Sequence, residues 1–312
     1  MLGYSDEKKE GLYELVEVPE EFGPVERLVD DYKIKAFAFS QDDYNEWYFT
    51  DNTPFQRRIA PAGVLANDLM AIFLTKYHSV VGLHTEEELR FHTPVFAGER
   101  VTLTGRYVDK YIKRGMGHVV LDTMAHGEDG RLVMQHHGTE VMRVAAGAVV
   151  GRQSAEAVPK RVTGEFDKDR EPATAARLDL HPGTPTETLT KVTHQDQMSV
   201  FSLAGQYVRN VHNDLDIARR AGLEKTLMQG QQQVCYAIEL MTRFFGAAWF
   251  TSGRLRVKFI APVYVDEIIE VQGVVTGASS DDEGERLDLE VWIRNGAGAL
   301  STVGWASARP GG

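Results

Sequence analysis

Two stretches of the sequence decide the fold: residues 89–105 read LRFHTPVFAGERVTLTG, and residues 257–273 read VKFIAPVYVDEIIEVQG. Each stretch has a basic and an aromatic residue, two spacers, Pro-Val-aromatic, a turn, and then an alternating segment that closes on glycine. Alternation of apolar and polar residues predicts a β-strand with one buried face. The second stretch begins 168 residues after the first, so the pair predicts an internal repeat.

Two further pairs of features support the repeat. The dipeptide Phe-Ser occurs at 39–40 and again at 201–202, which is an offset of 162 residues. Gly63 and Gly230, at an offset of 167 residues, each precede a long amphipathic stretch. Because the three pairs follow one another in the same order at nearly constant spacing, we predict a duplicated domain.

The segment between the two copies is rich in Ala, Gly, Pro and charged residues and has no sustained periodicity. We therefore expect an N-terminal domain at 1–150, a linker at 151–184 and a C-terminal domain at 185–312. A linker of this length is longer than compact domains usually contain without structure. Part of it is expected to pack along a surface.

Each copy has the pattern of one helix followed by several strands. Residues 63–77 and 231–245 place apolar side chains at helical spacing. Alternating runs predict strands at 100–108, 117–124, 132–142, 255–260, 268–275, 287–293 and 301–308. Because each helix must bury its apolar stripe, we expect an α+β fold in which two tandem antiparallel sheets lie side by side, each wrapped around a central helix.

The composition is that of a folded, soluble protein, with 43% hydrophobic and 25% charged residues among 312. Lys and Arg total 34 against 45 Asp and Glu, and the net charge of −11 disfavours nucleic acids and anionic membranes as partners. The single Cys235 excludes a disulfide framework and a CxxC-type metal site. The sequence contains neither a basic start followed by an apolar run nor an uninterrupted apolar stretch of about 18 residues. We therefore expect a cytoplasmic protein.

A polar motif stands before the first predicted helix. Residues 43–48, DYNEWY, fit the spacing D-x-N-P-[LIV]-H at Asp43 and Asn45, with Tyr48 where the His would fall. Aromatic residues flank Tyr48 on both sides, so we expect it to pack rather than to react. Asp43 is either a catalytic carboxylate or a helix cap.

The second copy keeps the histidine of this motif. Residues 201–223, FSLAGQYVRNVHNDLDIARRAGL, contain His212, with Gln206 at the Asp position and one additional residue before the His. Together with RLRVKFIAPVYVDE at 254–267 and TPVFAGERVTLTGRYVDKYIKRGMGHVVLD at 93–122, this segment resembles the MaoC-like, or hydratase 2, family. These are hot dog fold, (R)-specific enoyl-thioester hydratases and dehydratases.

The resemblance implies a tandem, or double, hot dog. It also implies reversible hydration of an enoyl thioester or dehydration of a 3-hydroxyacyl thioester, with the substrate on coenzyme A or an acyl carrier protein and no further cofactor. In eukaryotic relatives of this double form the second copy holds the catalytic pair and the first has lost it, in agreement with His212. We expect a homo-oligomer of double hot dogs.

Hydration beside a thioester carbonyl needs a group that takes a proton from water and returns one to the α-carbon. The developing enolate oxygen needs donors, which the free N–H groups at a helix N-terminus supply. Gly63, Gly230 and Gln231 at the two helix starts are therefore candidate substrate-binding residues. Asn210 in the motif is a further candidate. Lys113 and Arg114 lie in a basic turn that suits the phosphates of coenzyme A.

Three residues are candidate partners for His212. Gln206 has the family's carboxylate position but cannot act as a base. Asp214, two residues beyond the histidine, offers a local carboxylate. Asp43 offers one from the first copy, in a site shared by both copies.

Two other functions stay open. A thioester-binding or scaffold subunit that lost the chemistry would account for the incomplete motif. A hot dog thioesterase would use a carboxylate on a central helix, for which Glu239 and Asp68 are the candidates.

No metal site is expected. His118, His126, His136 and His137 lie on or near predicted strands, and the sequence places no carboxylate constellation near them.

Overall fold

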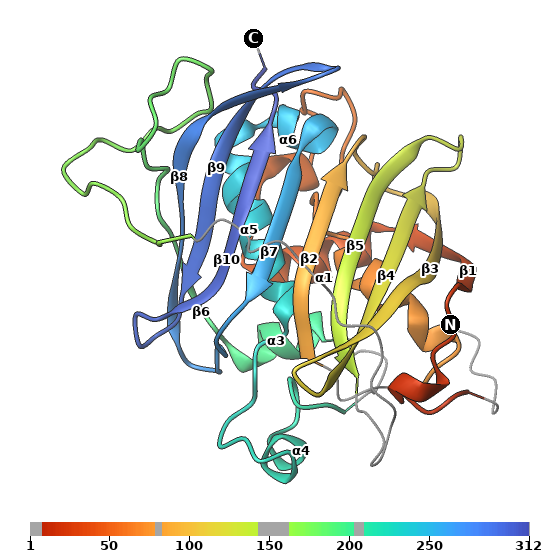
Figure 1. The fold of residues 1–312 in the computed structure, drawn as a ribbon. Helices are drawn as coiled ribbons and strands as arrows, with labels where there is room; N and C mark the ends of the chain where they lie inside the picture. The colour runs from red at the N-terminus through yellow and green to blue at the C-terminus, as the bar shows by residue number, and fades with distance from the viewer. Residues whose placement is uncertain (1–7, 79–82, 143–161, 203–208, 312) are drawn as a thin grey trace.

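The computed structural model describes residues 8–78, 83–142, 162–202 and 209–311. In this part of the chain, ten strands form one sheet in the order β1-β3-β4-β5-β2-β7-β10-β9-β8-β6 (Figure 1). The strands are β1 (Glu20–Val29), β2 (Leu83–Phe91), β3 (Glu99–Lys113), β4 (Met116–His126), β5 (Leu132–Met142), β6 (Leu189–Val192), β7 (Arg254–Phe259), β8 (Ile268–Asp281), β9 (Gly284–Arg294) and β10 (Leu300–Ala308). Every neighbouring pair is antiparallel.

The order of the strands contains the repeat. Read from either edge toward the middle, the first half runs β1-β3-β4-β5-β2 and the second runs β6-β8-β9-β10-β7. Strands β1 and β6, the first of each copy, therefore form the two edges. The duplication predicted from the sequence is present as two equal half-sheets, and the continuous sheet is made where β2 pairs with β7.

The two decisive stretches adopt the same local structure. Gly98 has φ 82° and Asp266 has φ 65°, so the same position in both copies is left-handed. Gly105 ends the first stretch where a Cβ would lie 2.6 Å from Thr123 Cγ2 on the adjacent strand. Glycine at that position lets the neighbouring strand approach.

The β2–β7 pair is held by different forces on its two faces. On the inner face Leu89 pairs with Leu255, and both side chains are buried. On the outer face Glu86 forms ion pairs with Arg256 and Lys258. These ion pairs are partly exposed to solvent, whereas the leucine contact is fully buried.

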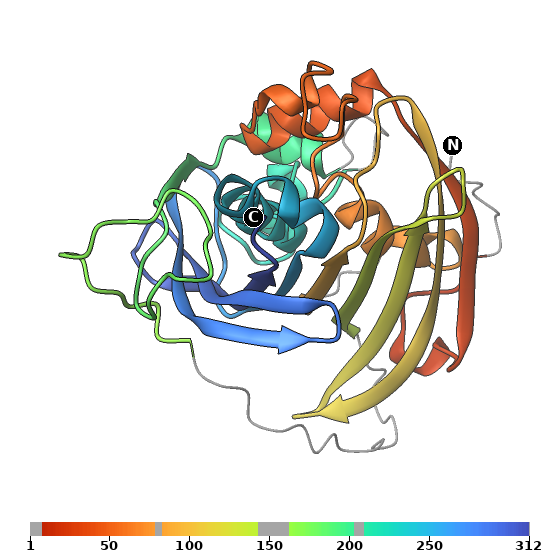
Figure 2. The same cartoon turned by 90° about the horizontal axis from the view of Figure 1, so that it is seen from above.

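Helices cover only one face of the sheet. The α-helices are α1 (Asp31–Gln41), α2 (Ala66–Met70), α3 (Gln195–Phe201), α4 (Leu215–Arg220), α5 (Gly230–Phe245) and α6 (Ala247–Ser252), and the 3₁₀ helices are η1 (Tyr13–Leu15), η2 (Glu46–Tyr48) and η3 (Ala71–Thr75). Figure 2 shows α5 against the sheet and α1 beyond it, so the molecule has three layers. Helices α1 and α3 are equivalent in the repeat and pack together, with ring centroids of Phe37 and Phe201 6.2 Å apart. None of the helices in the described ranges has both the length and the apolar character needed to cross a bilayer.

The central helices of the two copies are unequal. The prediction of a helix at 231–245 is confirmed by α5, which is buried along nearly its whole length. The predicted long helix at 63–77 is wrong, because α2 has five residues and continues as the 3₁₀ helix η3. Asn67 and Asp68 are poor helix formers, and their side chains bond outside the helix, to Gln229 and to basic residues respectively.

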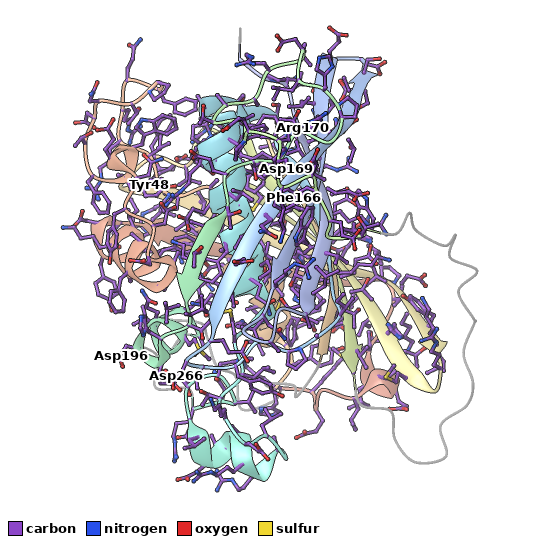
Figure 3. All side chains as sticks on the ribbon, turned by 90° about the vertical axis from the view of Figure 1, so that its left-hand side faces the viewer. Tyr48, Phe166, Asp169, Arg170, Asp196 and Asp266 are labelled. Carbon is purple, nitrogen blue, oxygen red and sulfur yellow. The ribbon has the colours of Figure 1, made fainter. Side chains whose placement is uncertain are left out.

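The described part of the linker packs on the second half-sheet. Val162 and Phe166 pack with Trp292 of β9, and Phe166 is labelled in Figure 3. The backbone N–H of Gly183 donates to the carbonyl of Val275. The exact domain boundaries stay a prediction.

We predict that Leu89→Ala lowers the free energy of unfolding by about 2–5 kcal/mol, because it opens a cavity at the junction of the half-sheets. The measurement is urea unfolding. The matched control is Leu178→Ala, since Leu178 is 42% exposed in the linker. Equal effects of the two substitutions would contradict a shared core across the junction.

Candidate active site

His212 lies in a tight turn between α3 and α4. Its backbone N–H donates to Asn210 Oδ1 at 2.8 Å, and its ring Nδ1 lies 2.7 Å from the carbonyl oxygen of Leu227. A carbonyl only accepts, so Nδ1 carries the proton and Nε2 of the neutral ring has a free lone pair. Burial lowers the pKa of His212 below its ordinary value, against the opposing effect of the Leu227 bond. The ring is therefore held as a neutral base.

Polar side chains fix the turn that carries His212. Asn210 Nδ2 donates to the carbonyl of Ser202, and Asn213 Nδ2 donates to Ser202 Oγ. Gln195 Nε2 donates to the carbonyl of His212 at 3.0 Å. Both polar atoms of the Asn210 side chain have protein partners, so this residue orders the turn rather than standing open to a substrate.

The start of α5 follows three residues after Leu227. No side chain of the described residues caps the helix there, and the N–H groups of Gln232 and Gln233 donate to the carbonyl of the N-cap residue Gln229. A Cβ on Gly230 would lie 3.2 Å from the ring of Phe259, so a side chain would be crowded at this position. Gln231, expected to meet the substrate, donates its Nε2 to Glu87 Oε1 at 2.7 Å.

Asp214 is not placed as a partner for His212. Its Oδ1 accepts from the backbone N–H of Ile217 as the N-cap of α4, and its Oδ2 pairs with Arg209. Arg209 first, and the cap second, lower the pKa of Asp214. The additional residue before His212 therefore leaves this carboxylate engaged in starting a helix.

Asp43 belongs to a different cluster. Its Oδ2 accepts from the hydroxyl of the buried Tyr48 at 3.1 Å, and burial raises its pKa. Nearby, Lys191 Nζ lies 2.9 Å from Glu239 Oε2, and burial raises the pKa of Glu239 to about 7. Glu239 is nine residues beyond Gly230 on α5, or about 13 Å along the axis.

Figure 3 shows the separation of these two sites. Tyr48 lies beside the upper part of α5, whereas Asp196, next to the Gln195 that holds His212, lies near the lower end. Asp43 and His212 thus have different partners, Tyr48 and Leu227, and the site shared by both copies stays a prediction.

The remaining predicted residues are dispersed. Gly63 faces α5, where a Cβ would lie 3.1 Å from Cys235 Sγ, so it serves helix packing rather than substrate approach. Lys113 and Arg114 lie at the β3–β4 turn, with Arg114 at φ 53°. Gln206 lies outside the described residues.

The thioesterase carboxylates are both engaged in ion pairs. Glu239 pairs with Lys191 and Arg243, and Asp68 pairs with Arg27 and Lys33. Neither carboxylate is therefore free of ion-pair partners to act as a base on water.

The expectation that the strand histidines lack carboxylates is wrong. His137 Nδ1 pairs with Asp122, and His136 Nε2 lies 2.9 Å from Glu87 Oε2 in the interior. Glu87 was not among the predicted site residues, because it lies within a run of three glutamates. Side chains two residues apart on a strand share one face, so the buried Leu89 could have indicated that Glu87 also points inward.

Comparisons with known proteins agree with this architecture. Residues 17–136 match a family model described as FAS1-like, dehydratase domain region. A solved MaoC-like dehydratase is similar to this chain, with TM-score 0.74, 18% identity, and coverage of 96% of this chain and 100% of that one. A putative MaoC domain protein dehydratase from Chloroflexus aurantiacus J-10-fl has TM-score 0.73 and 12% identity, with coverage of 99% of this chain and 100% of that chain.

A conserved hypothetical protein from Mycobacterium tuberculosis with a double hotdog fold has TM-score 0.65 and 13% identity, with coverage of 95% of this chain and 97% of that one. A comparison with curated protein sequences gives no match. The chain thus has the double hot dog fold. The match to a dehydratase domain region and the MaoC-like dehydratases among the similar structures agree with the resemblance of the sequence to MaoC-like hydratases and dehydratases.

We predict that Asp214→Asn leaves the rate of enoyl-CoA hydration and the melting temperature near those of the wild type, because Asn is an equally good helix cap. Asp214→Ala should lower the melting temperature without changing the rate per folded enzyme. The two readouts are initial rates and thermal unfolding. A large loss of rate in Asp214→Asn would instead show that the Asp214 carboxylate takes part in catalysis.

Proposed function

We propose that the protein catalyses the reversible hydration of an enoyl thioester to a 3-hydroxyacyl thioester, with the acyl group on coenzyme A or an acyl carrier protein. The observation that carries the proposal is His212, whose Nδ1 is fixed by the carbonyl of Leu227 just before the start of α5. The segment from Leu227 to Gly230 thus orients the His212 ring and leads into α5, whose N-terminus can stabilise negative charge.

In the hydration direction, Nε2 of His212 takes a proton from water as the oxygen attacks the β-carbon. The electrons of the double bond move toward the thioester oxygen, and an enolate forms. The N–H groups at the start of α5 and the helix dipole stabilise this oxygen. The imidazolium then returns the proton to the α-carbon, and dehydration is the reverse.

Two buried amide oxygens near the helix start support a polar ligand. Gln229 Oε1 and Gln231 Oε1 have no hydrogen-bond partner among the described residues. Buried acceptors without partners are costly, so such atoms are expected to bind water or a donor group of the substrate. The N–H groups of a pantetheine arm are donors of this kind.

The first copy supports a single active site in each chain. Tyr48 stands at the motif's histidine position and donates its hydroxyl to Asp43, so this pair is closed on itself. Gly63 is covered by α5. The chemistry therefore rests on the second copy.

We predict that His212→Ala lowers kcat/KM for hydration of crotonyl-CoA by at least about 100-fold, because a positioned acid–base group is lost. The decrease in absorbance of the conjugated thioester measures the rate. The melting temperature should stay nearly unchanged. An equally active variant would remove His212 from the mechanism.

The pH profile is a second readout of the same group. Because the pKa of folded His212 is lowered, the neutral base persists below pH 6.5, and the acid limb of kcat/KM should fall below that pH. The unfolded chain takes up this proton first as the pH falls, so stability also decreases below about 6.5. His212→Gln should remove this contribution to the pH dependence of stability.

We predict that Gln206→Asp maintains or raises the hydration rate, because it restores the carboxylate that the resembled family has at this position. A carboxylate in a partly dry site has a raised pKa, so the gain should grow toward higher pH. Initial rates across pH measure it, with Asp43→Asn as the control. If Asp43→Asn abolishes the rate and Gln206→Asp has no effect, the active copy is wrongly assigned.

A further inference from the structure

Three chemistry-bearing side chains converge inside the first half-sheet, apart from His212. His84 and Glu87 lie on β2, and His136 lies on the adjacent β5. One ligand atom from each lies within 4.8 Å of the other two. Nε2 of His84 is 2.7 Å, and Nε2 of His136 is 2.9 Å, from the same carboxylate oxygen, Oε2 of Glu87.

Two outer hydrogen bonds fix the orientation of this cluster. His136 Nδ1 lies 3.0 Å from Thr123 Oγ1 on β4, which leaves Nε2 directed toward Glu87. Glu87 Oε1 accepts from Gln231 Nε2, which leaves Oε2 directed toward the histidines. Outer partners of this kind orient the ligands in protein metal sites.

The geometry of His84 differs from that of a hydrogen-bonded ion pair. Its Nε2 is close to Glu87 Oε2, yet neither ring nitrogen makes a well-directed hydrogen bond within the described residues. A paired N–H would point at the oxygen. A ring nitrogen without a directed hydrogen bond is open to a ligand that binds among the three side chains.

We propose that His84, Glu87 and His136 bind one divalent transition-metal ion, with Zn²⁺ as the ion that fits best. Two imidazole nitrogens and one carboxylate oxygen form a ligand set that zinc accepts in a tetrahedral site with one open position. Cys235 is not a member of the set, since its thiol is directed to the carbonyl of Gly63 at 3.8 Å.

His84 is the ligand nearest the surface, with 11% side-chain exposure, whereas the side chains of Glu87 and His136 are buried. The bound ion would fix Glu87 and, through it, Gln231 at the start of α5. It would therefore connect the first half-sheet to the central helix of the second copy.

Zinc binding by the full chain, purified without a histidine tag, tests the proposal. After incubation with Zn²⁺ and dialysis, elemental analysis should give about one zinc per chain, and Co²⁺ in its place should give visible d–d absorption. Neither measurement involves substrate, so it is independent of the proposed hydration. A wild-type protein that retains no stoichiometric zinc would overturn the site.

Variants locate the ion. His84→Ala and Glu87→Gln should abolish stoichiometric zinc, and Thr123→Val should weaken it about 10–100-fold, as for other outer partners. His137→Ala is the matched control. His137 follows the proposed ligand His136 on β5, but its side chain is exposed on the outer face and pairs with Asp122. The site is wrong if His137→Ala loses zinc or His84→Ala retains it. His84 lies nearest the surface of the three, so His84→Ala serves if Glu87→Gln does not fold.

Discussion

The pairing of β2 with β7 is the contact on which the rest of the structure depends. It places Glu88 opposite Arg256, and these two residues occupy equivalent positions of the repeat, so the pseudo-twofold axis passes through this pair. Because the strands are antiparallel, each half-sheet then extends outward from the same line. The apolar inner faces of both halves meet over α5, and one core serves both copies.

The sequence predicted the repeat and most of the strands, because alternation in a half-buried strand follows directly from the pleat. It also singled out His212, whose neighbourhood is set by local chain geometry and the nearby Leu227. It failed at the helix of the first copy, where contacts of Asn67 and Asp68 with distant residues override local periodicity. No spacing rule indicates such contacts.

Charged residues were the hardest to place for a related reason. Asp214 had the right residue type near His212, but capping of α4 decides its orientation. Glu87 was overlooked because acidic runs are usually solvated. Lys191 is a similar case: its ammonium is buried against Glu239 and donates to the carbonyls of Gln41 and Asp42, which joins the two copies. Loss of Glu239 would remove the ion pair of the buried Lys191 ammonium, whereas loss of Lys191 would leave Glu239 paired with Arg243.

The covalent fusion of the two copies has a consequence for how the interior can vary. In a symmetric dimer of single hot dogs, any substitution beside the axis appears twice, so a buried acid would face its own duplicate. Here the repeat places Leu255 at the position that corresponds to Glu87. One chain thus holds a carboxylate and an apolar side chain at sites that an ancestral pair would have been forced to make identical. A single chain can therefore hold different side chains at equivalent positions of its two half-sheets.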